Sequence, residues 1–156
     1  MSGITSIKMQ NLDRFPQSKV ISKNWQISKL PGLNAQEQAQ LAQLGVSTTL
    51  QLLQQCQTTT QRQALATQLR VRVETVNKWV ALANLARIPS VGCQYCGVLL
   101  HIGIISVAQL AQTPLHQLHQ QVLRLQVTTT QRRDLCPSRS EMQVWINQAR
   151  SLASHL

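Results

Sequence analysis

The chain has 156 residues and a formal net charge of +10, and 43% of its residues are hydrophobic although only 3% are aromatic. This length suffices for one domain or two small modules, and the positive charge favours a polyanionic partner, either nucleic acid or an acidic protein. The five acidic residues are scattered, which leaves little material for acid/base catalysis by paired carboxylates, so we expect no enzyme. No apolar run reaches the roughly 18 residues that cross a bilayer, so no transmembrane segment is predicted. The N-terminus lacks the apolar core of a secretory signal, so we expect a cytoplasmic protein with reduced cysteines.

The first segment, residues 1–28, differs in composition from the rest of the chain. It is rich in Lys, Arg and Ser, it contains Pro16, and it has no sustained apolar period. Such a segment buries too little apolar surface to fold by itself, so we predict a flexible basic arm. Trp25 and Ile27 lie near its end, and we expect them to attach the arm to the folded body.

The first predicted module, residues 29–87, opens with the sequence LPGLNAQEQAQLAQLGV. An apolar-Pro-Gly-apolar start, a helix of small and large apolar residues and a final Gly-apolar pair are typical of a helix-hairpin-helix. Gly45 is expected to end this helix because glycine accepts the left-handed conformation. Farther along, Thr58 and Gln61 of the sequence TTTQR fit a capping box, which predicts the start of another helix.

The second predicted module, residues 88–156, repeats the first. Its opening sequence IPSVGCQYCGVLLHIGI aligns without gaps with residues 30–46, and Gly103 stands at the expected helix end. The sequence TTTQR recurs, and its Thr128 and Gln131 predict a second capping box. A Trp-bearing helix closes each copy. Internal similarity of this kind indicates two related helical modules that are fused.

The predicted hairpins are candidates for phosphate binding. A tight hairpin exposes backbone N–H groups at a helix N-terminus, where the partial positive charge suits an anion. The candidate residues are Gly32, Leu33 and Asn34 in the first module and Val91 and Gly92 in the second. Each hairpin keeps only one of its two expected glycines, and Gln replaces the usual phosphate-facing Lys in both. A hairpin that serves only packing and partner docking is therefore the alternative.

Positive charge lies elsewhere in both modules. Arg62 in the first module, and Arg132 and Arg133 in the second, follow the threonines of the two TTTQR sequences. At a predicted helix start these side chains can meet phosphate, because the helix N-terminus and the guanidinium group both favour anions. The alternative is that the arginines only solubilise helix surfaces.

Cys93 and Cys96 form a Cys-x-x-Cys pair near a helix N-terminus, where the helix dipole is expected to lower the pKa of the thiols. A zinc ion needs two further ligands, for which the candidates are His101, His116, His119 and Cys136. The spacing matches no standard zinc finger, and the first module builds the same hairpin without cysteine. Structural packing, zinc binding and redox chemistry are all open at this point.

The chain from residue 30 to about residue 152 resembles a bacterial family of tandem, degenerate helix-hairpin-helix domains that is still labelled a domain of unknown function. The segments that carry the resemblance are LPGLNAQEQAQLAQLGV, KWVALANLARIPSVG, GVLLHIGI and VWINQAR. The resemblance implies an all-α fold related to DNA-repair hairpin modules, and it brings no activity with it.

We therefore predict an all-α protein in which two fused helix-hairpin-helix-like modules form one compact helical body with a basic N-terminal arm. The expected function is non-enzymatic binding of nucleic acid through phosphate contacts. The alternative is a protein-protein interaction adaptor in a larger assembly, with a structural zinc ion or a redox-sensitive Cys-x-x-Cys. No cofactor other than this zinc is expected.

Overall fold

A computed structural model describes residues 20–130 and 136–154, and in these ranges the protein is all-α with eight α-helices and no strand. The elements are the 3-10 helix η1 (Ile27–Lys29) and the α-helices α2 (Ala35–Gln43), α3 (Thr49–Gln55), α4 (Thr59–Leu69), α5 (Val73–Ala86), α6 (Gly92–His101), α7 (Val107–Ala111), α8 (Leu115–Thr130) and α9 (Arg139–Ser154). The predicted all-α class is confirmed. None of the described helices is long and apolar enough to span a membrane.

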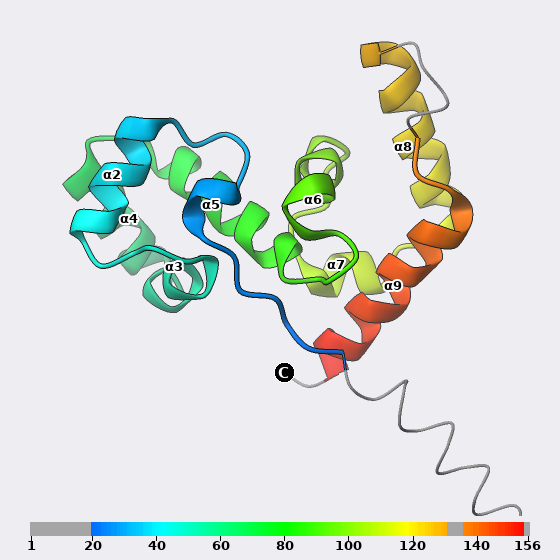
Figure 1. The fold of residues 1–156 in the computed structure, drawn as a ribbon, viewed down its shortest axis with the longest axis horizontal. Helices are drawn as coiled ribbons and strands as arrows, with labels where there is room; N and C mark the ends of the chain where they lie inside the picture. The colour runs from blue at the N-terminus through cyan, green and yellow to red at the C-terminus, as the bar shows by residue number, and fades with distance from the viewer. Residues whose placement is uncertain (1–19, 131–135, 155–156) are drawn as a thin grey trace, which may run out of the picture.

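Helix α5 lies between the two halves of the molecule. Figure 1 shows α2, α3 and α4 on one side and α8 and α9 on the other, with α5, α6 and α7 between them. Eight of the 14 residues of α5 are buried, because it packs against α3 and α4 of the first half and against α6 of the second. A helix that is apolar over most of its circumference is stable only inside a core. The buried side chains form one cluster, which includes Trp79 of α5 and Trp145 of α9.

The ends of α2 and α6 are built alike, as the repeat predicts. Gly45 and Gly103 follow these helices with φ of +85° and +93°, values that glycine accepts without strain. In both cases the next amide donates back to a carbonyl in the last turn, over 2.9 Å from Val46 to Leu41 and over 3.0 Å from Ile104 to Leu99. These bonds are those of a Schellman motif, which stops a helix and satisfies its free carbonyls. The predicted helix ends are therefore confirmed.

The two TTTQR sequences have different structures. In the first, the Gln61 N–H donates to Thr58 Oγ1 over 3.1 Å and the Thr58 N–H donates to Gln61 Oε1 over 3.0 Å, so the predicted capping box of α4 is confirmed. In the second, Thr128 lies inside α8, which continues to Thr130, so the predicted helix start is wrong. Before the first TTTQR, α3 ends at Gln55 and a Cys-Gln turn follows, whereas α8 has not ended where Thr128 occurs.

The segment from residue 20 to residue 28, which the predicted arm includes, packs on the body. The Trp25 N–H donates to Thr49 Oγ1 over 3.0 Å, and the indole Nε1 donates to the Ala86 carbonyl over 2.7 Å. A Cβ atom added to Gly92 would lie only 3.0 Å from a Trp25 ring carbon, so the indole covers this glycine closely. Ile27 is buried in the core. Trp25 and Ile27 therefore attach the segment as expected, and Trp25 joins α3 to the junction of α5 and α6.

Candidate functional site

In the first hairpin, a backbone N–H group takes part in capping the helix α2 that follows. Gly32 has φ of +84°, and Leu33 is buried in the core. Asn34 caps α2, since the Glu37 N–H donates to its Oδ1 over 2.7 Å while the Asn34 N–H donates to Glu37 Oε1 over 3.0 Å. The Glu37 carboxylate thus lies at the start of α2 and takes one of the backbone donors. Both features disfavour a phosphate at this helix N-terminus.

The second hairpin is closed by contacts within the protein. The Ser90 N–H donates to Gln148 Oε1 of α9 over 2.9 Å. The N–H groups of Val91 and Gly92 donate to the Ile88 carbonyl over 3.0 and 2.9 Å. The backbone donors predicted to bind phosphate therefore already have partners, and the indole of the N-terminal segment covers the turn. This geometry favours the packing alternative for the second hairpin.

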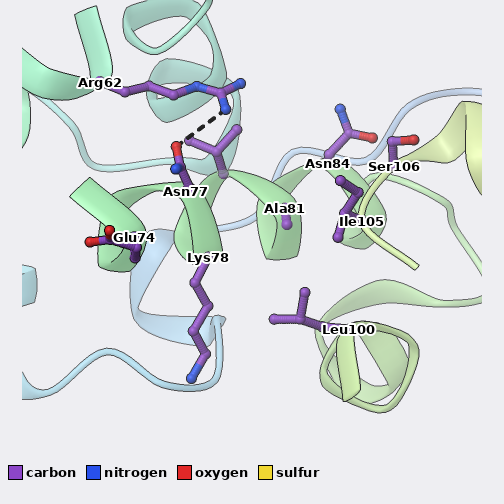
Figure 2. A pocket seen from close by; sticks show the side chains of 10 residues that line it. Arg62, Glu74, Asn77, Lys78, Ala81, Asn84, Leu100, Ile105 and Ser106 are labelled. Carbon is purple, nitrogen blue, oxygen red and sulfur yellow. Dashed lines mark hydrogen bonds between the residues drawn. The ribbon is translucent and has the colours of Figure 1, made fainter. Parts of the chain in front are cut away.

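A groove along α5 is the strongest candidate site. This α5 groove has a volume of about 500 Å³ and is lined by Arg62, Glu74, Asn77, Lys78, Val80, Ala81, Asn84, Leu100, Ile105 and Ser106 (Figure 2). Its floor is the buried Val80 and Ala81 of α5. Polar side chains from α4, α5 and the loop between α6 and α7 surround this floor, so the groove combines two cations, the Glu74 carboxylate, and amide and hydroxyl groups with an apolar base.

Arg62 is the one predicted arginine that the structure places at this groove. Its Nε donates to the Cys56 carbonyl over 3.0 Å, and its Nη1 donates to Asn77 Oδ1 over 3.4 Å (Figure 2). These bonds hold the guanidinium group at one side of the groove. Arg132 and Arg133, the other predicted phosphate contacts, lie outside the described residues.

Lys78 was not among the predicted site residues. It extends from α5 away from Arg62 (Figure 2), and its Nζ lies 3.8 Å from the position of a Cβ atom on Gly32. The first hairpin thus has a cation beside it from another helix, in place of the missing local lysine. The sequence pattern could have indicated this residue. Polar residues at positions 74, 77, 78 and 84 recur at helical spacing in a mostly apolar helix, which predicts one polar face that includes Lys78.

The Cys-x-x-Cys pair does not have activated thiols. Cys96 is fully buried, and its Sγ donates to the Cys93 carbonyl over 3.8 Å. Burial raises the pKa of the Cys96 thiol to about 12, and burial also raises the pKa of Cys93, with Lys29 opposing the shift. The expected lowering of these pKa values by the helix dipole is wrong, because the cost of burying a thiolate outweighs the dipole.

The residues considered for zinc are not brought together. No three His, Cys, Asp or Glu side chains within residues 20–130 and 136–154 lie close enough to hold one metal ion. His116 and His119 are on α8 and Cys136 precedes α9, whereas the cysteine pair is on α6. The described arrangement therefore does not support the proposed zinc site, and the four cysteines are free thiols.

We expect the native protein to show two classes of thiol toward an alkylating reagent at mildly alkaline pH. Cys56 and Cys96 are buried and their pKa values are raised, so they stay protonated and should react only after unfolding. Cys93 and Cys136 are half-buried and should be modified faster. Mass spectrometry of peptides after timed alkylation measures both rates, with the urea-unfolded protein as control. Rapid modification of Cys96 in the native state would contradict this assignment.

Comparison with known proteins identifies a family. A family model described as a domain of unknown function, DUF4332, matches residues 31–152. No curated protein and no solved structure matches the chain. The match covers most of the chain and includes α2 to α8 completely, together with most of α9. This chain therefore belongs to the DUF4332 family.

Proposed function

We propose that this protein is a non-enzymatic binding module that binds nucleic acid through phosphate contacts. In this proposal, α2 to α5 and α6 to α9 are two helix-hairpin-helix-like modules, and the α5 groove receives the phosphate backbone. The observation that carries the proposal is the cationic charge around this groove. The hairpin turns contribute structure, because their backbone donors are largely used within the protein.

Positive charge dominates the described residues. They contain ten Lys and Arg residues against three acidic ones, which are Glu37, Glu74 and Glu141. Within this part of the chain the one ion pair joins Arg72 Nε to Glu74 Oε2 at 3.7 Å, and both side chains are largely exposed. Such a pair neutralises little charge in water. An excess of this kind attracts a polyanion, and nucleic acid gains affinity by releasing its condensed counterions.

The groove favours contact with phosphates over stacking on bases. Arg62, Asn77, Lys78, Asn84 and Ser106 offer hydrogen-bonding groups along it. Among the residues that the structure describes, no aromatic side chain lines it. Elsewhere in the described residues, two tryptophans are buried, the indole nearest the N-terminus packs on the second hairpin, and the tyrosine ring packs on a tryptophan with centroids 4.9 Å apart. Proteins that bind single strands by stacking need exposed aromatic platforms, so phosphates are the better fit here.

A specific observation favours a second candidate, a protein-protein interaction adaptor with an acidic partner. Ile105 is 58% exposed at the edge of the α5 groove, next to the apolar floor around Ala81. An acidic segment with one apolar side chain would match this floor and the cations beside it. A partner captured from a lysate after nuclease treatment, and lost on Ile105→Asp, would select this candidate over nucleic acid.

We expect the wild-type protein to bind a labelled DNA or RNA duplex at low salt, with log affinity falling linearly as log salt concentration rises. Replacing Arg62 by Gln should weaken binding similarly for all sequences and reduce the salt slope by about 1, because one phosphate contact is lost. Fluorescence anisotropy across a salt series measures both quantities. Circular dichroism controls for folding, since Arg62 also bonds to the Cys56 carbonyl. Absence of wild-type binding even at low salt would refute the proposed function.

A further inference from the structure

We propose that a small cavity beside the first hairpin binds one phosphate group of the nucleic acid, with Lys78 and His101 as the groups that contact it. The cavity has a volume of about 220 Å³, and its lining includes Pro31, Gly32, Lys78, Leu82, Leu100 and His101. The proposal rests on the proposed function and deepens it, because it places one phosphate of the bound backbone at defined side chains.

The cavity is formed where the first hairpin crosses α5 and α6. Lys78 runs beside the hairpin, with its Cε and Nζ both 3.8 Å from the position of a Cβ atom on Gly32. On the other side, Pro31 Cγ lies 3.6 Å from the position of a Cβ atom on Gly97 of α6. His101 is the last residue of α6 and is exposed. A cation from α5 and an imidazole from α6 therefore border the same cavity, although they belong to different halves of the chain.

The charges around this cavity suit an anion. No carboxylate lines it in the part of the chain that the structure describes. Lys78 has no hydrogen-bond or ion-pair partner among the described residues, so its ammonium group is available to a ligand. Leu82 and Leu100 form apolar walls of the cavity. The imidazole of His101 supplies an N–H donor, and phosphate oxygens accept from both groups.

Because the cavity adjoins the α5 groove, its expected ligand is a phosphate of the nucleic acid backbone. Lys78 and Leu100 line both this cavity and the α5 groove, so the two are adjacent. A backbone that follows the groove from Arg62 therefore reaches the cavity at Lys78 (Figure 2). Lys78 and His101 would also bind a small free phosphate. The experiment therefore tests both a free phosphate compound and a nucleic acid.

The test uses the full chain and two probes, inorganic pyrophosphate and a short nucleic acid duplex. Lys78→Gln and His101→Gln remove the two contacts, Lys78→Arg keeps the charge, and Arg139→Gln removes the same charge from an exposed residue of α9. With pyrophosphate, NMR should show shifts of the Gly32 amide and the His101 ring in the wild type, and their loss in Lys78→Gln. With the duplex, Lys78→Gln should reduce the salt slope by about 1, and Lys78→Arg should restore it.

The outcomes separate this proposal from the proposed function. Larger losses of duplex affinity in Lys78→Gln and His101→Gln than in Arg139→Gln support the cavity as a phosphate site. Equal losses in all three variants, with clear wild-type binding, overturn the cavity and leave the proposed function intact. Pyrophosphate shifts at Gly32 and His101 without any duplex binding refute nucleic acid as the source but support a phosphate site. The absence of shifts with either probe overturns the proposal.

Discussion

Replacing Trp25 by Ala should lower the free energy of unfolding by about 3 kcal/mol, within the range for removing a large packed aromatic side chain. The indole is half-buried, packs on Gly92 and donates to the Ala86 carbonyl over 2.7 Å. Its loss leaves a gap at the junction of α5 and α6, together with a carbonyl that has lost its donor. Urea denaturation followed by the helical circular dichroism signal measures the change.

Trp25→Phe is the matched control for this prediction. It keeps an aromatic ring against Gly92 but removes the N–H that donates to Ala86, so we expect a loss of about 1 to 2 kcal/mol. The difference between the two variants reports the packing contribution of the ring. A loss below about 1 kcal/mol for Trp25→Ala would show that the N-terminal segment contributes little to the stability of the body.

Gly92→Ala should lower the free energy of unfolding by about 2 to 4 kcal/mol, because two costs combine. The backbone of Gly92 has φ of +53°, which an L side chain adopts only with strain, and the added Cβ atom would lie 3.0 Å from the Trp25 ring. Either the indole or the start of α6 must move. Thermal and urea unfolding of the purified variant measure the loss.

Gly97→Ala offers a matched control in the same helix. A Cβ atom on Gly97 would lie 3.6 Å from Pro31 Cγ, an ordinary contact, and alanine favours a helix interior. This variant should therefore stay within about 1 kcal/mol of the wild type. If the clash with the indole is a major cost, Gly92→Ala should cost less in the Trp25→Ala background. If Gly92→Ala lowers the free energy of unfolding equally in the wild type and in Trp25→Ala, the whole loss comes from backbone strain at Gly92.

Much of the local structure could be predicted from short stretches of sequence. The capping box at Thr58 and the helix ends at Gly45 and Gly103 follow from side-chain and backbone chemistry within six residues. Thr128 does not start a helix although the capping residues are present in the sequence, because α8 has not ended there. A threonine caps a helix only where the preceding chain has left the helical conformation, and nothing before Thr128 interrupts it.

Candidate site residues were harder to predict, because their environment comes from distant parts of the chain. The Cys96 thiol was expected to be activated from its place near a helix start, yet its pKa rises because neighbouring elements bury it. The second hairpin was expected to offer backbone N–H groups to a ligand, yet Gln148 of α9 accepts from the Ser90 N–H at this turn. Desolvation and long-range hydrogen bonds depend on which helices meet, and local spacing does not specify that.

The sequence by itself determined the all-α class, the repeat that relates α2 to α6, and the large excess of positive charge. These follow from composition, apolar periodicity and turn chemistry, which act over a few residues. Only the tertiary structure decided that Trp25 covers Gly92 and that Lys78 lies beside Gly32. Both contacts join segments more than 40 residues apart, and they form only when distant elements pack around one core.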